Sequence, residues 1–257
     1  MSLVNFRDSA VLSDPEGLLI RPGVLYRSAQ PFPAADEAVV AQLRACDIRT
    51  VVDLRDPRET RPDDWAAAEA AGIAVVAAPV NPATDALTAH MATMTTAADL
   101  GEFYLLLAES APEAVAAAVE ATTRPGAVLL HCAAGKDRTG LLTALLLDLL
   151  GVPADRIVED YARTAEALPQ IFANLAERHR TALNDRGTAT RVTDSEGRTL
   201  TIPAPLLQAP AEAMSVFLGH VRTRHGGAEA FLPACGVPAA TLAAFRSKAA
   251  VPAAPAV

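Results

Sequence analysis

A cysteine and an arginine stand six positions apart in the segment HCAAGKDRTG, residues 131–140. The apolar run AVLL precedes this segment and a leucine-rich run follows it, which predicts a loop that joins a buried strand to a helix. Backbone N–H groups of such a loop, with the unpaired N–H groups of the first helical turn, suit an oxyanion. Ala133, Ala134 and Gly135 are small and let an anion approach the backbone. The segment therefore predicts a binding cradle for an anion.

The reactive side chains of this loop favour phosphoryl chemistry. Arg138 offers a planar fork for two phosphate oxygens, and Lys136 adds a second cation. Among these donors and cations we expect Cys132 to be a thiolate that attacks a bound phosphoryl group and forms phosphocysteine. Thr139 places a hydroxyl where it can stabilise the departing thiolate. His131 is placed to orient the loop through a hydrogen bond.

Two other interpretations of the loop are weaker. A lone cysteine after an apolar strand is usually a buried small hydrophobe, but that leaves Lys136, Asp137 and Arg138 unexplained at a strand-to-helix turn. A nucleotide-binding loop of the Walker type is excluded, because AAGKDRTG has one glycine before the lysine and lacks the GxxxxGK[ST] spacing.

Composition limits the function and the compartment. The 257 residues carry 30 acidic and 22 basic side chains, a formal net charge of -8, which argues against a nucleic-acid partner. Cys46, Cys132 and Cys235 are too few and too scattered for a disulfide framework or a zinc site. No secretory signal and no membrane span are predicted, since the most apolar run, GLLTALLLDLLGV, is short and contains Asp148. We expect a cytoplasmic protein.

The apolar patterns predict one α/β domain over residues 1–257, with a central, mostly parallel sheet flanked by helices. Strands are predicted at 24–27, 49–56, 73–80 and 127–132. Helices are predicted at 35–48, 63–72, 99–110, 112–126, 137–151 and 153–168. Residues 81–98 are a possible lid or a loop with a short helix. Residues 184–203 suggest a hairpin insert around DSEG, residues 208–248 suggest three short helices, and the tail AVPAAPAV is predicted to be disordered.

The loop and its flanking segments resemble a known family. HCAAGKDRTG matches the HCxxGxxR[ST]G loop of the cysteine-dependent tyrosine and dual-specificity phosphatases, and its GKDRTG form resembles the bacterial atypical tyrosine/lipid phosphatases. NFRD, GVLYRSAQP, IRTVVDLRDPRE and APAEAM are similar to segments of that family in the same order. The sequence departs from the family after NFRD, where glycines are usual, and at His225, where an aromatic residue is usual. The resemblance covers most of the chain and implies a tyrosine-phosphatase-like fold with a helical C-terminal extension.

The resemblance implies that Cys132 is the nucleophile, that Arg138 is the phosphate clamp and that residues 133–139 form the cradle. Asp137 is the first candidate for the general acid because the atypical family has an aspartate there, although its cationic neighbours favour the charged form. The runner-up is Asp53, with a structural role bracing Arg55 or Arg138 as the alternative.

The substrate class stays open at this point. The resemblance implies phosphotyrosine, with phosphoserine, phosphothreonine or phosphoinositides as further substrates, and a small phosphate ester is also possible. Lys136 is expected to favour polyanionic head groups. Arg27 and Arg55 are expected at the rim of the pocket, with pairing to local carboxylates as the alternative, since arginines at strand ends often form such pairs. No metal and no cofactor is expected, because Arg138 and the backbone amides supply the electrostatic stabilisation. The rival functions are a rhodanese-like sulfurtransferase and a catalytically inactive phosphate-binding module. The oligomeric state is not predicted.

Overall fold

The computed structural model describes residues 2–12, 20–80, 84–179, 182–186, 189–193 and 199–250. The strands of its main sheet are β1 (Arg7–Asp8), β2 (Leu25–Ser28), β3 (Ile48–Asp53), β4 (Ala74–Ala77) and β5 (Ala127–His131). The α-helices are α1 (Glu37–Ala45), α2 (Ala66–Ala70), α3 (Asp85–Thr93), α4 (Ala97–Glu109), α5 (Pro112–Thr122), α6 (Asp137–Leu149), α7 (Ala154–Ala162), α8 (Leu168–His179), α9 (Ala211–His225), α10 (Ala228–Ala234) and α11 (Ala239–Ala249). Short 3₁₀ helices are η1 (Ser9–Leu12), η2 (Pro57–Glu59), η3 (Arg163–Ala167) and η4 (Ala204–Leu207).

The main sheet has the strand order β1-β2-β5-β3-β4. β1 pairs antiparallel with β2, and the other neighbours pair in parallel, which confirms the predicted mostly parallel sheet. β5 lies between β2 and β3, although it is the last of the five strands along the chain. All of its residues are buried. Ligands of open α/β sheets bind beyond the carboxyl ends of the strands, where the strand order reverses. The segment after His131 leaves the sheet at such a point.

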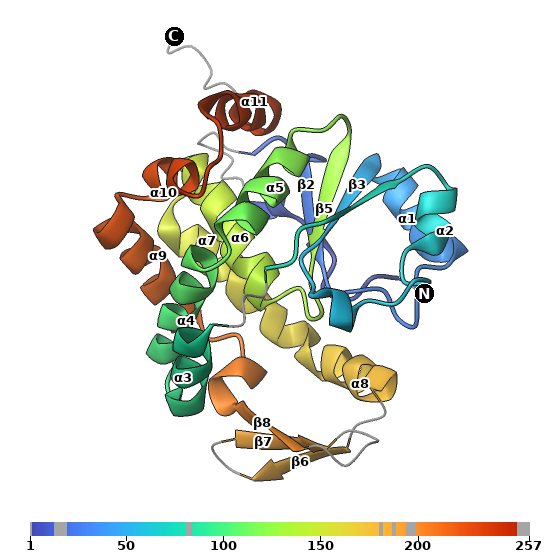
Figure 1. Ribbon diagram of the computed structural model, residues 1–257. Coiled ribbons are helices and arrows are strands. Elements are labelled where there is room, and N and C mark those ends of the chain that lie inside the picture. Colours follow the sequence, from blue (N-terminus) through green and yellow to red (C-terminus); the bar gives the residue numbers. More distant parts are fainter. Residues whose placement is uncertain are drawn as a thin grey trace.

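Alternate residues of β5 enter two separate cores, one on each face of the sheet. Val128 and Leu130 belong to the larger core with the residues of α4, α5 and α6, whereas Leu129 belongs to the smaller core with those of α1 and α2. Figure 1 shows α1 and α2 on one side of the sheet and α5, α6 and α7 on the other. Most of α6 is fully buried, so the helix that begins in the candidate loop is fixed by close packing along its length.

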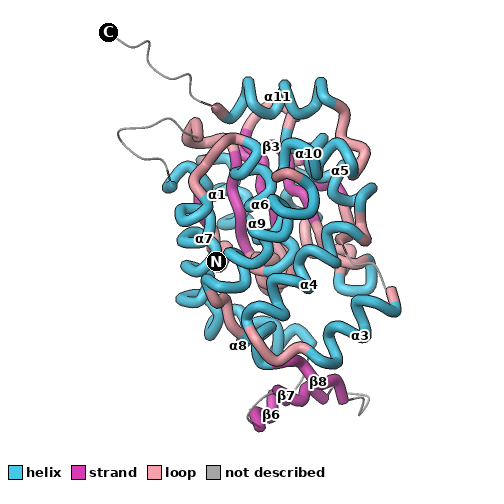
Figure 2. The backbone as a smooth tube through the Cα atoms, turned by 90° about the vertical axis from the view of Figure 1, so that its left-hand side faces the viewer, coloured by secondary structure: helices cyan, strands magenta, loops and turns pink. Residues whose placement is uncertain are grey.

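A second sheet of three antiparallel strands follows α8: β6 (Ala182–Arg186), β7 (Ala189–Thr193) and β8 (Thr199–Pro203). It lies at the end of the molecule opposite α11 (Figures 1 and 2). The predicted hairpin is present as β7 and β8, and β6 is an additional strand that the prediction missed. The predicted turn DSEG lies outside the described residues. The three C-terminal helices are confirmed, as α9, α10 and α11.

Other expectations were incomplete. The possible lid at 81–98 contains α3 and the start of α4, and residues 81–83 lie outside the described residues. The helix predicted at 153–168 is α7 followed by η3, and α8 was missed altogether. The tail from residue 251, predicted to be disordered, also lies outside the described residues. Among the described helices, none is long and apolar enough to cross a membrane.

Candidate active site

The segment of residues 132–139, which we call the cradle loop, connects β5 to α6. Its tightest point is Gly135, whose backbone has φ +65°. A Cβ at this position would lie 2.2 Å from the carbonyl oxygen of Ser28, at the end of β2. Only glycine combines the left-handed conformation with this close approach to a neighbouring strand. The glycine therefore lets the loop curl against the sheet.

The carbonyl groups of the cradle loop are held on its outer side. The backbone N–H of Gln30 donates to Ala133 O at 3.2 Å. Asn5 Nδ2 donates to Ala134 O at 3.3 Å and to Gly135 O at 3.1 Å. These bonds come from the segment after β2 and from the N-terminal NFRD motif, so distant parts of the chain orient the peptide groups of the loop.

The N–H groups of the same peptides have no such partners. Among the residues that the structure describes, no group accepts a hydrogen bond from the backbone N–H of residues 133–138. The hydroxyl of Thr139 is also buried, and it has no hydrogen-bond partner among the residues that the structure describes. Unpaired N–H groups in a loop of small residues and in the first turn of the following helix suit an anion, so this array indicates an anion site. The nucleophile candidate, Cys132, is 2% exposed at the start of the loop.

A buried charge cluster supports the loop from behind. Arg27 Nη2 donates to Gly135 O at 2.8 Å, and its Nη1 lies 2.5 Å from Asp160 Oδ2 in α7. Arg7 Nε lies 2.6 Å from the other oxygen of Asp160. Both arginines and Asp160 are largely buried, so the cluster places a net charge of one positive unit behind the anion cradle. This charge favours an anion in the cradle even though the protein as a whole is acidic.

Arg138 is held by a residue that the sequence analysis did not single out, Glu59. The two carboxylate oxygens accept from Arg138 Nη1 at 2.5 Å and from Nη2 at 2.8 Å. Glu59 is positioned locally, because it completes a capping box in which Asp56 N donates to Glu59 Oε2 at 2.9 Å and Pro57 opens η2. The sequence DPRE after β3 therefore builds the support for the arginine.

The pairing with Glu59 leaves one edge of the Arg138 guanidinium available. The contacts to Glu59 and Leu54 use Nη1 and one N–H of Nη2. Among the described residues, Nε–H and the second N–H of Nη2 have no acceptor. These two N–H groups are parallel and can hold two phosphate oxygens. Burial alone would lower the pKa of Arg138, but the hydrogen bonds and charge of Glu59 raise it above its usual value. The guanidinium therefore stays charged.

His131 joins the loop to a buried polar cluster at the end of β3. Its Nε2 lies 3.0 Å from the indole Nε1 of Trp65, which can only donate, so the proton of the ring is on Nδ1. Nδ1 then donates to Cys132 O at 3.2 Å, as expected for a residue that orients the loop. Burial lowers the pKa of His131, which agrees with a neutral ring. Trp65 is itself buried, and its indole N–H fixes this tautomer.

Asp53 is placed as a structural carboxylate. Its carboxylate accepts hydrogen bonds from the backbone N–H, Nε and Nη2 of Arg55, the shortest from Nη2 to Oδ2 at 2.6 Å, so it braces Arg55 and not Arg138. Burial opposes its ionisation, but the hydrogen bonds and the positive charge of Arg55 outweigh this effect and lower the pKa of Asp53. The expectation that Arg27 and Arg55 line the rim is wrong, because they are 1% and 2% exposed and paired with buried carboxylates.

Asp137, the first candidate for the general acid, lies at the first position of α6 and is 23% exposed. Tyr104 in α4 donates to Asp137 Oδ1 at 2.6 Å, and Lys136 Nζ lies 3.3 Å from the same oxygen. Among the described residues Oδ2 has no partner. Asp137 is thus more accessible than Asp53 and has one oxygen available for proton transfer.

Lys136 is placed differently from the sequence-based expectation. Its side chain is 1% exposed, and Nζ donates to the carbonyl oxygens of Leu206 and Gln208 beside η4. Two of the three N–H groups of the ammonium are thus bonded to backbone carbonyls, and Asp137 Oδ1 lies 3.3 Å away as an ion-pair partner. The geometry does not support contact between Lys136 and a polyanionic head group, because the protein itself provides the acceptors. Lys136 instead ties the cradle loop to the segment that follows β8.

This placement predicts the behaviour of Lys136→Met. The variant leaves two carbonyl groups without their donor, and we expect it to lose about 2 kcal/mol or more of unfolding free energy. The ratio of phosphoinositide to phosphotyrosine hydrolysis should stay the same. Thermal unfolding and parallel assays on both substrates check this result. Lys248→Met is the matched control, because Lys248 Nζ also donates to two backbone carbonyls, those of Thr122 and Arg124. A selective loss of phosphoinositide hydrolysis in Lys136→Met alone would restore the original expectation.

The sequence contained uneven signals for the supporting residues. Asn5 and Arg7 belong to NFRD, and Glu59 belongs to DLRDPRE, two of the segments that carry the family resemblance. The sequence shows that these residues belong to family-like motifs, but it does not show that they contact the cradle loop or its charged neighbours. Asp160 and Tyr104 gave no signal, because both occur in ordinary amphipathic helix patterns.

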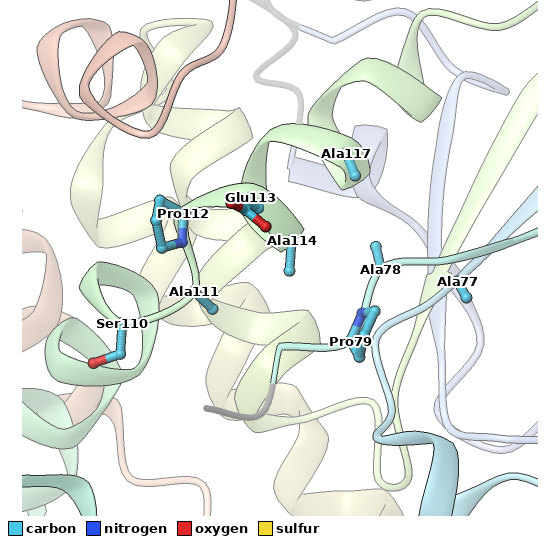
Figure 3. Close-up of a pocket in the computed structure, with 9 residues that line it drawn as sticks. All are labelled: Ala77, Ala78, Pro79, Ser110, Ala111, Pro112, Glu113, Ala114 and Ala117. Atoms are coloured by element: carbon cyan, nitrogen blue, oxygen red, sulfur yellow. The ribbon is translucent and has the colours of Figure 1, made fainter. Parts of the chain in front are cut away.

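A separate hollow of about 530 Å³ lies between the segment after β4 and the start of α5 (Figure 3). Its walls are mostly alanine and proline, and the charged residue among those lining it is an acid, Glu113. Such a lining offers an anion no cationic partner. The hollow is therefore not the phosphate site.

The fold and the loop together define a class. A cysteine and an arginine of one strand-to-helix loop, at the carboxyl edge of a mostly parallel sheet, are the arrangement of a cysteine-dependent phosphatase. The sequence model described as the tyrosine phosphatase family matches residues 1–250. The chain belongs to this family.

Two relatives and one solved structure are similar to this chain. The triple specificity protein phosphatase PtpB of Mycobacterium tuberculosis is 32% identical over 204 residues, which cover 67% of this chain and 71% of that protein. A protein of Cupriavidus necator named as a candidate tyrosine-protein phosphatase is 35% identical over 166 residues, 62% of this chain. The match spans 60% of the Cupriavidus protein, less than two thirds of its length. The catalytic core of the S. cerevisiae PP-IP phosphatase Siw14 aligns with a TM-score of 0.41 and 18% identity, over 64% of this chain and 78% of that one.

Proposed function

We propose that this protein hydrolyses phosphate monoesters through a phosphocysteine intermediate, with phosphotyrosine as the first substrate class. The observation that carries the proposal is the geometry of the cradle loop. Its carbonyl groups are bonded on the outside by Gln30, Asn5 and Arg27, while its N–H groups and Thr139 have no acceptor in the described chain. Membership of the tyrosine phosphatase family favours this chemistry over sulfur transfer.

The proposed reaction has two steps. The thiolate of Cys132 attacks phosphorus, an S–P bond forms, and the P–O bond to the leaving alcohol breaks while its oxygen takes a proton from the general acid. Water then attacks the phosphocysteine, gives a proton to the same residue as base, and the P–S bond breaks to release inorganic phosphate and the thiolate. Arg138 and the N–H groups of the loop stabilise the equatorial oxygens in both steps. Thr139 can donate to the sulfur as its charge returns.

Asp137 is our candidate for the general acid. Its exposure and the available Oδ2 suit proton transfer to a bound ester, whereas Asp53 is committed to Arg55 and its lowered pKa keeps it ionised. His131, Asp53 and Arg55 then act together as a support for the start of the cradle loop, and Arg27 as a support for its middle.

The substrates beyond phosphotyrosine are proposed on a weaker basis. The relative from Mycobacterium tuberculosis is named a triple specificity protein phosphatase, which supports testing other phosphoproteins. The placement of Lys136 supplies no separate argument for phosphoinositides, which stay within the test as one class.

A phosphate-release screen tests the proposal. Phosphotyrosine and phosphoserine peptides, short-chain phosphoinositides and small phosphorylated metabolites are assayed at equal concentration in EDTA, with a variant lacking the Cys132 thiol as control for contaminating phosphatase. We expect the highest kcat/KM on phosphotyrosine and no effect of EDTA. Release no faster than the control for every class, together with turnover of thiosulfate, would replace the proposal with sulfur transfer. Binding of phosphate without any release would indicate the inactive module.

A further inference from the structure

Two buried tyrosines connect the general acid candidate to the hydrophobic core. Tyr104 lies in α4 and Tyr161 in α7, and their side chains are 0% and 1% exposed. Their hydroxyl oxygens are 2.7 Å apart, and the Tyr104 hydroxyl lies 2.6 Å from Asp137 Oδ1. Side chains of α4, α6 and α7 thus form one chain of hydrogen bonds that ends at the Asp137 carboxylate.

The direction of these hydrogen bonds follows from the number of protons. A tyrosine hydroxyl has one proton, and Tyr104 donates it to the carboxylate of Asp137. The hydroxyl of Tyr161 must therefore donate to Tyr104. Burial and the nearby Asp137 raise the pKa of both tyrosines well above the usual value, so both remain protonated donors. The chain of donors ends at Oδ1.

The contacts of Asp137 distinguish its two oxygens. Oδ1 accepts from Tyr104 and lies 3.3 Å from Lys136 Nζ, while Oδ2 has no partner among the described residues. An oxygen that accepts one hydrogen bond and lies beside an ammonium group is a poor place for an additional proton. A proton on this carboxyl group is therefore directed to Oδ2.

We propose that Tyr104 is a positioning residue of the reaction, which holds Asp137 Oδ1 so that Oδ2 carries the proton delivered to the leaving oxygen. This inference rests on the proposed function and makes it more specific. The proton moves from Oδ2 to the leaving oxygen as the P–O bond breaks, and water returns a proton to Oδ2 in the second step. Tyr104 exchanges no proton. It acts by restricting the rotation of the carboxyl group, and Tyr161 acts only by orienting Tyr104.

The ring of Tyr104 allows a clean substitution. It packs edge-to-face against Tyr161 and Phe217, with ring centroids 6.0 Å and 6.3 Å apart. Tyr104→Phe keeps this packing and removes only the hydroxyl. Tyr161→Phe is the matched control, because it removes a hydroxyl from the same cluster that has no contact to Asp137.

The test measures kcat/KM for aryl phosphates whose leaving phenols range from strongly to weakly acidic. Asp137→Asn should lose about 10²-fold on the poorest leaving group and little on the best one. Tyr104→Phe should lose about tenfold on the poorest leaving group, again with little effect on the best, and Tyr161→Phe should lose less. In the double variant Tyr104→Phe/Asp137→Asn, the loss should equal that of Asp137→Asn alone, because Tyr104 acts through Asp137.

The experiment distinguishes failure of the inference about Tyr104 from failure of the proposed function. Equal loss on all leaving groups in Tyr104→Phe, or additive losses in the double variant, would overturn the inference while the phosphatase function stands. A flat dependence in Asp137→Asn would remove Asp137 as the acid and the inference with it. If the wild type hydrolyses none of the aryl phosphates, the proposed function itself fails, and with it the role of Tyr104.

Discussion

Cys132→Ser is expected to lose at least about 10³-fold in phosphate-monoester hydrolysis while it still binds phosphate. A serine hydroxyl does not ionise at neutral pH, so the attacking atom is lost. The binding groups are independent of the sulfur, because the cradle loop is held by Gln30, Asn5 and Arg27 and the arginine clamp by Glu59. Assays of kcat/KM and calorimetric titration with inorganic phosphate measure the two effects separately.

Cys235 provides the control for the loss of a thiol. Cys235 is also buried, and burial together with Glu109 raises the pKa of its thiol to about 11, so it is protonated at neutral pH. Cys235→Ser should keep its activity, and brief treatment with iodoacetate near neutral pH should label Cys132 before Cys235 in a mass-spectrometric digest. More than a tenth of wild-type activity in Cys132→Ser would show that the nucleophile lies elsewhere.

Gly135→Ala has the second largest expected effect, because it changes both the stability and the cradle. Its Cβ would lie 2.2 Å from Ser28 O in a backbone with φ +65°, so either the loop or the end of β2 must shift. We expect a loss of about 3 kcal/mol or more in unfolding free energy from backbone strain and overpacking together. A shifted loop also misplaces its N–H groups, and kcat/KM should fall by about 10²- to 10³-fold.

Gly151 separates the two causes. It follows α6, has φ +81°, and a Cβ there would meet nothing within 4 Å. Gly151→Ala should therefore cost only the left-handed strain, about 1 kcal/mol, and leave kcat/KM unchanged. Denaturant unfolding and kinetics of the two variants are compared directly. Similar stabilities and similar activities for both variants would mean that the contact with Ser28 does not constrain the loop.

The main elements and the reactive residues were predictable because their signals are local. An apolar strand, small residues and a helix start in direct succession predict the anion cradle, and spacing alone relates Cys132 to Arg138. The strands at 73–80 and 127–132 were found from continuous apolar runs. Less periodic segments gave weaker results. β6 was missed because ALNDR lacks a clear alternation. α8 was missed although Leu168, Ile171, Phe172 and Leu175 have helical spacing.

The supporting contacts were not predictable, because each depends on residues far apart in the chain. Nothing near Asp160 in the sequence indicates that two arginines from the N-terminal segment surround it. Asp53 was the acidic residue considered as a brace for Arg138, but Glu59 holds it instead. The capping box of η2 positions Glu59 for this contact. Lys136 is the clearest case. A lysine in an anion loop is expected to face the anion, but its partners are backbone carbonyls about 70 residues away.

The sequence by itself therefore determined the mostly parallel sheet, the class of chemistry and the candidates for nucleophile and clamp, because apolar runs mark the strands and one short strand-to-helix segment carries all the reactive groups. Tertiary structure decided how that segment is held and which of its charges face a substrate. Asn5, Arg27 and Glu59 orient the loop, Lys136 is turned to the protein, and Asp137 receives Tyr104 from the core. The physical reason is that a hydrogen-bond partner is chosen by distance in the folded chain, and separation along the sequence does not record that distance.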